Sequence, residues 1–216
     1  MSCDAWWRPT SRRDDPPSVK IWGLTGGIGM GKSFAARVFR RARVPVFDAD
    51  LAVHLLQAKG GVAVRPIGLA FPASVREGAV DREALRRIVL NDPAALRRLE
   101  GIVHPLVRRA ERRFLARARA RGERLAVLDI PLLFETRRDA RDFDAVLVVS
   151  APAAVQAQRV LRRPGMTPAR LAAIRARQLP DLDKRRRADH VIRTGLSRYH
   201  TTAALRRLLL KALPHA

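Results

Sequence analysis

The sequence predicts an α/β fold in which a five-stranded parallel sheet is flanked by helices. Five short apolar runs have the length of strands, and segments with helical spacing of apolar residues separate them. This alternation is typical of parallel sheets, because a helix carries the chain back across the sheet in a right-handed connection. At 216 residues the chain is long enough for one domain with a sizeable core.

The first strand is expected at residues 19–24, and helical spacing follows at residues 32–43. The residues between them fit the pattern G-x-x-x-x-G-K-[ST], in which glycines let backbone N–H groups face the phosphates of a nucleotide. The N-terminus of the following helix adds partial positive charge. We therefore predict a P-loop nucleoside-triphosphate-binding fold, against the alternative of a glycine-rich turn without a ligand. The predicted ATP-binding residues are Gly26, Gly27, Ile28, Gly29, Met30, Gly31, Lys32, Ser33 and Phe34.

Two side chains of this loop, and one acid elsewhere, are expected at the phosphates and their metal ion. Lys32 would reach the β- and γ-phosphates, and the Ser33 hydroxyl would ligate Mg²⁺. Asp129 ends a later apolar strand, where P-loop proteins carry a metal-associated acid. Asp129 is therefore a second candidate metal ligand, and its alternative role is that of a helix cap.

A second strand is expected at residues 44–47, followed at once by Asp48 and Asp50. Ligands of open α/β sheets gather outside the carboxyl ends of the strands, so these aspartates and the phosphate loop should share one edge. Asp48 either orients a metal-bound water or caps the next helix. Residues 60–79 are expected to be rich in loops, because glycine and proline recur there.

Helical signals dominate the chain between the second and third strands. Asp81 is expected to cap one helix, and Asp92 precedes a proline at the first position of the next. The apolar stripe of that helix is interrupted near His104 and Pro105, so a separate helix is expected to continue beyond them. These segments, about residues 60–121, predict a helical lobe over the substrate.

The last part of the chain alternates between strands and helices. Strands are expected at residues 125–129, 145–149 and 188–192, and helices at 152–163, from 167 onward and at 198–213.

The formal net charge of +23 favours non-specific binding to polyanions. Arginine supplies 38 of the 43 basic residues, and these are scattered over many segments, so no specific nucleic-acid function is expected. No apolar run approaches the length of about 20 residues that a membrane span needs. Cys3 is the only cysteine, which excludes an internal disulfide and suits a cytoplasmic location. Residues 1–17 are expected to form a disordered N-terminal extension.

Five segments, taken in order, resemble the dephospho-CoA kinase family, and the resemblance covers roughly residues 19–213. It implies a kinase domain at 18–213 that transfers the γ-phosphoryl group of ATP, with Mg²⁺, to the ribose 3′-hydroxyl of dephospho-CoA. This reaction ends coenzyme A biosynthesis. The matching segments are Leu24-Thr25-Gly26-Gly27-Ile28-Gly29-Met30-Gly31-Lys32-Ser33, Val46-Phe47-Asp48-Ala49-Asp50, Val103-His104-Pro105-Leu106, Asp129-Ile130-Pro131-Leu132-Leu133-Phe134-Glu135 and Ala188-Asp189.

The resemblance also implies roles for particular residues. Asp50 would orient or deprotonate the acceptor hydroxyl, and its alternative is a surface or loop-capping aspartate. Arg159 and Arg163 belong to an expected lid, about residues 155–187, and would close on the phosphates as catalytic residues; their alternative is that of solvated surface arginines. The implied substrate-binding residues are Asp48, Asp50, His104, Pro131, Leu132 and Glu135. The alternative for His104 is a histidine that packs at a helix junction.

The chain departs from the family pattern at three places. Met30 and Phe34 stand where smaller or polar residues are common, and Arg193-Thr194-Gly195 replaces a turn that often contains asparagine. Two other functions stay open from the residues alone: a kinase for a nucleoside or nucleotide, and a nucleic-acid-binding P-loop protein.

Overall fold

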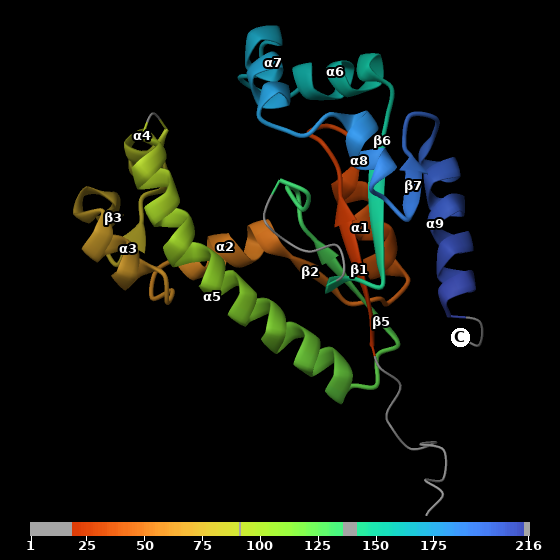
Figure 1. The fold of residues 1–216 in the computed structure, drawn as a ribbon, viewed down its shortest axis with the longest axis horizontal. Coiled ribbons are helices and arrows are strands. Elements are labelled where there is room, and N and C mark those ends of the chain that lie inside the picture. The colour runs from red at the N-terminus through yellow and green to blue at the C-terminus, as the bar shows by residue number, and fades with distance from the viewer. Residues whose placement is uncertain (1–18, 91, 136–141, 214–216) are drawn as a thin grey trace, which may run out of the picture.

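The computed structural model describes residues 19–90, 92–135 and 142–213, so the extension predicted at residues 1–17 lies outside the described part. Five parallel strands form one sheet in the order β2-β5-β1-β6-β7, as Figure 1 shows. The predicted parallel sheet is therefore confirmed. Its strands are β1 (Lys20–Thr25), β2 (Val46–Asp48), β5 (Leu125–Asp129), β6 (Ala145–Ser150) and β7 (His190–Arg193).

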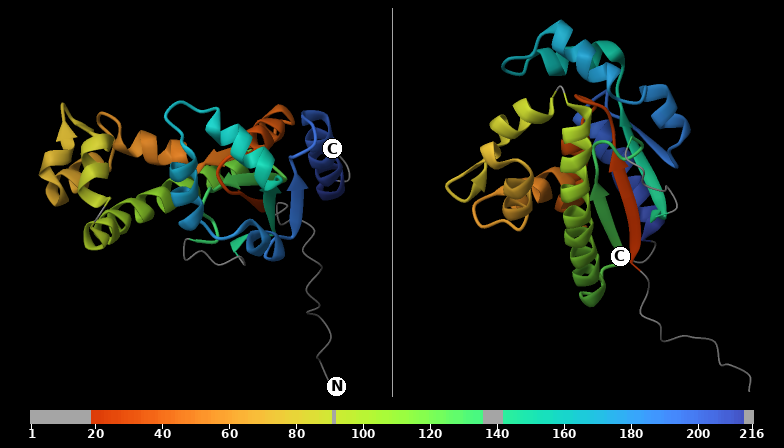
Figure 2. Two further views of the ribbon diagram at one scale, coloured as in Figure 1. Left: turned by 90° about the horizontal axis from the view of Figure 1, so that it is seen from above. Right: turned by 60° about the vertical axis from the view of Figure 1, so that its left-hand side comes forward.

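Helices cover both faces of this sheet, which is why its central strands are buried along their whole length: every residue of β5 and of β6 is buried, and only their last residues, Asp129 and Ser150, are polar. One face packs against α1 (Lys32–Arg41) and α9 (Arg198–Ala212), and the other packs against the C-terminal half of α5 (Pro93–Ala120). Figure 2 shows α5 lying along its face of the sheet. Among the described residues, no helix is long and apolar enough to cross a membrane.

Beside the sheet, a helical unit surrounds a hydrophobic cluster of its own, at the left of Figure 1. Residues of α5 pack in this cluster and also against the sheet, and Val107 belongs to both groups. The unit therefore has a fixed connection to the sheet. It contains α2 (Ala49–Gln57), α3 (Val64–Ala70), α4 (Arg82–Val89), the N-terminal half of α5, and a small hairpin of β3 (Val75–Arg76) and β4 (Ala79–Val80).

The prediction of a loop-rich segment at 60–79 is wrong, because this segment holds α3 and the hairpin. Pro66 lies in the first turn of α3, where its missing N–H breaks no helical hydrogen bond. Gly68 is packed closely, since a Cβ atom there would lie 3.3 Å from Val75 Cγ2. Proline and glycine therefore serve a helix start and a close contact here, and they do not mark a loop.

The predicted break near His104 and Pro105 is also wrong, because α5 continues through both residues. Proline removes the hydrogen bond to the carbonyl group four residues earlier, which here is Gly101. Gly101 and Pro105 are both exposed, so water can solvate that carbonyl. Apolar residues before and after the proline pack into two clusters, and this packing holds the helix together.

A third group of helices follows β6: α6 (Ala153–Leu161) and α7 (Pro168–Ala176) stand beyond the carboxyl ends of the strands, at the top of Figure 1, and α8 (Asp181–Arg186) lies beside β6. The group covers most of the segment predicted as a lid. Pro152 and Thr167 precede α6 and α7 as their N-caps, at the positions that the sequence indicated.

Candidate active site

The glycine loop joins β1 to α1, as the motif predicts. Gly29 and Gly31 both have positive φ angles, 73° and 94°, which glycine adopts without strain. Gly31 also lies against Thr194, because an added Cβ atom would be 3.1 Å from Thr194 Oγ1. A larger residue at Gly31 would therefore change both the backbone and this contact.

Thr194, in the turn after β7, supports the loop from one side. Its buried hydroxyl donates to the carbonyl group of Met30 at 2.6 Å. Met30 itself is buried, and its sulfur accepts a hydrogen bond from the N–H of Ala151 at 3.2 Å. Two of the three departures from the family pattern, Met30 and Arg193-Thr194-Gly195, thus contact each other and form part of the loop's support.

Arg159 also contacts this turn. Its guanidinium donates to the carbonyl oxygen of Thr194 at 2.6 Å and to Thr194 Oγ1 at 3.2 Å. Arg163 is exposed just after α6. Arg159 is therefore held by Thr194 in this structure, and the closing of either arginine on phosphates stays a prediction.

Phe34 follows Ser33 at the start of α1. Its ring packs partly buried against the core, and the guanidinium groups of Arg37 and Arg198 each lie 5.9 Å from its centroid. This side chain is thus occupied between α1 and α9, and its backbone N–H donates to Gly31 O at 3.0 Å.

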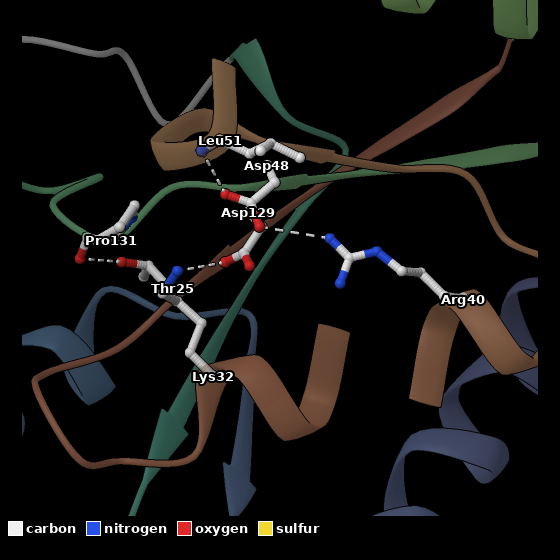
Figure 3. A network of polar contacts seen from close by, with 7 residues as sticks. All are labelled: Thr25, Lys32, Arg40, Asp48, Leu51, Asp129 and Pro131. Atoms are coloured by element: carbon white, nitrogen blue, oxygen red, sulfur yellow. Dashed lines mark hydrogen bonds and ion pairs between the residues drawn. The ribbon is translucent and has the colours of Figure 1, made fainter. Parts of the chain in front are cut away.

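Lys32 forms an ion pair with Asp129, with 2.7 Å between Nζ and Oδ1 (Figure 3). Asp129 is almost fully buried at the end of β5. Burial raises the pKa of its carboxyl group above the ordinary value, and the neighbouring Lys32 ammonium opposes this shift in part. The phosphate-loop lysine is thus held by a carboxylate in this structure.

Asp48 pairs with Asp129 in the register of β2 and β5, and Figure 3 shows the two carboxylates close together. Asp48 accepts a hydrogen bond from the N–H of Leu51 at 3.0 Å and so caps α2. Arg40 lies 3.5 Å from its other oxygen. The helix cap is thus present in the structure, and the orientation of a metal-bound water by Asp48 stays a prediction.

Asp50 lies in the first turn of α2 and is exposed to a cavity of about 680 Å³, named here the Asp50 cavity. This cavity lies between α2, α5 and the segment after β5. Its lining brings together five of the six residues implied in substrate binding and leaves out Asp48. The five are Asp50, His104, Pro131, Leu132 and Glu135.

The segment after β5 is fixed to the phosphate loop's strand. Thr25 is fully buried at the end of β1, and its hydroxyl donates to Pro131 O at 3.0 Å (Figure 3). This bond sets the distance between the wall of the Asp50 cavity and the start of the loop.

A second cavity of about 800 Å³, named here the Met30 cavity, opens beside the phosphate loop. Gly27 and Met30 line it, together with residues of the predicted lid and of the turn after β7. The sequence carries no signal for two of its lining side chains, Gln156 and Gln178. Lys184 precedes three arginines, and the sequence leaves it between a contact to the phosphates and a solvated charge. Neutral glutamines on a helical surface carry no motif, and a buried lysine beside a run of arginines cannot be told from a solvated one by its sequence.

One buried ion pair connects the two cavities. Lys184, 1% exposed, lines the Met30 cavity, and its Nζ lies 2.6 Å from Oε1 of Glu135, which lines the Asp50 cavity. The angles at this contact are those of an ion pair and do not meet the requirements of a hydrogen bond. Glu135 Oε1 also accepts a hydrogen bond from the N–H of Leu179 at 2.9 Å. The two cavities therefore share a charged contact.

No group of three or more His, Cys, Asp or Glu side chains that could hold a metal occurs in the described ranges. A Mg²⁺ ion in a kinase is held largely by the phosphates and water, with one or two protein oxygens. The Ser33 hydroxyl and the Asp129 carboxylate are hard oxygen donors of the kind that Mg²⁺ takes, so the residues present fit this ion.

A phosphate loop between two cavities at the carboxyl edge of a parallel sheet defines a P-loop kinase. The family model for dephospho-CoA kinase matches residues 20–197. The chain belongs to the dephospho-CoA kinase family, and it is therefore a kinase, an enzyme of coenzyme A biosynthesis that uses ATP.

Individual relatives support the same conclusion. The chain is 63% identical over 167 residues to a dephospho-CoA kinase of Paramagnetospirillum magneticum, covering 77% of this chain and 78% of that protein. It is 58% identical over 175 residues to a dephospho-CoA kinase of Mesorhizobium japonicum, covering 81% and 87%. Among solved structures, TT1252 from Thermus thermophilus has a TM-score of 0.79 at 35% identity, covering 90% of this chain and 98% of that one.

Proposed function

We propose that the chain transfers the γ-phosphoryl group of ATP, bound at the glycine loop and the Met30 cavity, to the ribose 3′-hydroxyl of dephospho-CoA in the Asp50 cavity. The observation that carries this proposal is the shared lining of the Asp50 cavity. Three separate segments of the chain, each matched to the family from the sequence, meet around one space beside the loop. A carboxylate, Asp50, is exposed to that space.

The reaction needs few groups from the protein. The acceptor oxygen attacks the γ-phosphorus, the bond from that phosphorus to the bridging oxygen breaks, and ADP leaves. The hydroxyl proton passes to the Asp50 carboxylate. Because phosphoryl transfer has a loose transition state, the protein's main work is to position both oxygens and to balance charge.

Lys32 would exchange its partner when ATP binds. In this structure its ammonium contacts Asp129 at 2.7 Å, and the incoming β- and γ-phosphates offer it stronger negative charge. Ser33 and Asp129 would hold Mg²⁺, which neutralises charge on the phosphate oxygens. An Asp129 that is released by Lys32 is free to take up this role.

The location of the protein, its domain boundaries and its binding to polyanions are part of the same proposal. A cytoplasmic location is proposed from the cysteine usage, and the predicted domain boundaries and lid stay proposals. Non-specific contact with polyanions is proposed from the charge of +23.

The first test is an assay of ADP release with ATP, Mg²⁺ and dephospho-CoA, with the product identified by mass. We expect ADP release that depends on the acceptor and a product that carries one added phosphate. Acceptor-independent release, or a panel of nucleosides that are better acceptors, would replace this function with that of another small-molecule kinase.

Asp50→Asn is expected to lower kcat by about 100-fold or more, because a base at the hydroxyl contributes roughly 10²–10⁴-fold. The affinity for ATP should change little, since Asp50 lines the other cavity. Asp48→Asn is the matched control, because asparagine keeps the cap of α2, and its kcat should fall less than about tenfold. Equal turnover in Asp50→Asn and the unmodified enzyme would refute the base assignment.

A further inference from the structure

The peptide groups on both sides of Ile28, in the middle of the phosphate loop, are held by side chains from the helices above it. Gln156 of α6 donates from Nε2 to the Ile28 carbonyl oxygen at 2.8 Å. The N–H of Ile28 donates to Oε1 of Gln178, after α7, at 3.1 Å. Gln156 is 5% exposed, so its hydrogen bonds are shielded from water.

Arg175 of α7 determines which way the Gln156 amide points. Its Nε and Nη2 both donate to Gln156 Oε1, at 2.9 and 2.5 Å, and Nη2 also lies 3.2 Å from Ala153 O. A guanidinium can only donate, so the amide oxygen must face Arg175. The amide nitrogen then faces Ile28 and supplies the donor that its carbonyl accepts.

This contact fixes the direction of one backbone donor of the loop. The Ile28 carbonyl and the Gly29 N–H belong to one peptide plane, and in a trans peptide they point to opposite sides. Because Gln156 holds the carbonyl, the Gly29 N–H is turned away from α6. Gly29 has a φ of 73° and no side chain, so the peptide group between Ile28 and Gly29 would rotate easily without the bond from Gln156.

Helix α6 also leaves no room for a side chain at Gly29. A Cβ atom on Gly29 would lie 2.5 Å from Val160 Cγ2 and 3.2 Å from the Gln156 carbonyl oxygen. The loop and α6 are therefore in direct contact, and a change in the position of α6 reaches the loop through Gln156.

We propose that Gln156 is a positioning residue for the triphosphate, that Arg175 orients its amide, and that Gln178 completes the clamp on Ile28. The clamp presents the Gly29 N–H to the phosphates in a fixed direction and joins the helices of the predicted lid to nucleotide binding. The proposal rests on the proposed binding of ATP at this loop.

The test compares Gln156→Met with Gln158→Met by the Kd for ATP and by the separate KM values for ATP and dephospho-CoA. Gln158 is the matched control, because it is an exposed glutamine of the same helix. Gln156→Met is expected to raise the Kd and KM for ATP about tenfold, as the loss of a buried hydrogen bond at the binding loop predicts. The KM for dephospho-CoA should stay within about twofold, and Gln158→Met should bind ATP normally.

Arg175→Met tests whether the arginine acts through the glutamine. Alone, it is expected to weaken ATP binding several-fold; in the Gln156→Met background it should add little, because its target is gone. Additive effects of the two substitutions would refute the orienting role of Arg175.

Gln156→Glu is the second variant, which keeps the proposal testable if Gln156→Met does not fold. A carboxylate keeps both bonds to Arg175 but offers Ile28 O no hydrogen, so ATP should bind more weakly while the unfolding temperature is retained. If the Gln156 variants bind ATP as tightly as Gln158→Met, the clamp has no positioning role. Normal ATP binding without turnover of dephospho-CoA would instead contradict the proposed acceptor and leave the clamp intact.

Discussion

At the scale of single residues, the strand-end carboxylate Asp129 links stability to pH. Burial raises the pKa of Asp129 above 3.8, its ordinary value, with Lys32 opposing the shift. Between 3.8 and the raised value the folded protein therefore binds more protons than the unfolded chain. The free energy of unfolding then falls as pH rises through this window, because stability falls with pH wherever the folded state holds the extra proton.

Asp129→Asn removes this titration and gives a testable difference. Relative to the variant, the unmodified protein should lose stability as pH rises from 3.8 through the raised pKa of Asp129, because the carboxyl group ionises in its buried site over that window. Urea unfolding of both proteins across this range measures the difference. A difference that stays constant, or that grows in favour of the unmodified protein, would contradict the raised pKa.

The sequence predicts some of these residues and cannot predict others, and the reason is their separation along the chain. Lys32 and Ser33 lie in a local motif, and Asp50 and Asp129 follow strands whose ends meet at one edge. The bond from Gln156 to Ile28 joins residues 128 positions apart. Contacts of this kind depend on how α6 packs on the loop, and no local pattern encodes that packing.

At the scale of elements, α5 shows that packing outweighs a local break. Pro105 costs the helix a hydrogen bond, yet the apolar residues around it hold one continuous helix of 28 residues. The same reasoning explains why the sequence suggested two helices here and a loop at 60–79. Proline and glycine signal breaks reliably only where tertiary packing is weak. Here both segments pack into the hydrophobic cluster that the helical unit surrounds.

Pro105→Ala should therefore stabilise the protein. Alanine restores the donor to Gly101 O, which is worth up to about 3 kcal/mol in a helix interior, and the gain is reduced by about 1 kcal/mol because the unfolded chain becomes more flexible. We expect the free energy of unfolding to rise by about 1–2 kcal/mol in urea titrations. Arg109→Ala, an exposed change on the same helix, should shift it by less than about 0.5 kcal/mol. A loss of stability in Pro105→Ala would mean that the ring itself packs favourably.

At the scale of the whole molecule, the charge of +23 and the enzymatic site are separate features. The solvent-facing side of α5 carries eight exposed arginines, and other arginines are spread over the remaining helices. They are Arg97, Arg98, Arg108, Arg109, Arg112, Arg113, Arg117 and Arg119. Exposed charge of this kind attracts any polyanion and gives no base-specific contact.

Binding to a labelled single-stranded RNA of mixed sequence should therefore weaken by about tenfold or more between roughly 50 and 200 mM salt, because the counterions that the RNA releases dominate the free energy. The same RNA should leave ATP turnover unchanged, since of these eight arginines only Arg108 lines a cavity, the Asp50 cavity. Fluorescence anisotropy over a salt series and the ADP-release assay with and without RNA measure both effects. RNA binding that persists at 200 mM salt together with stimulated ATP turnover would show that the basic surface serves the active site, and the two features would then have to be explained as one.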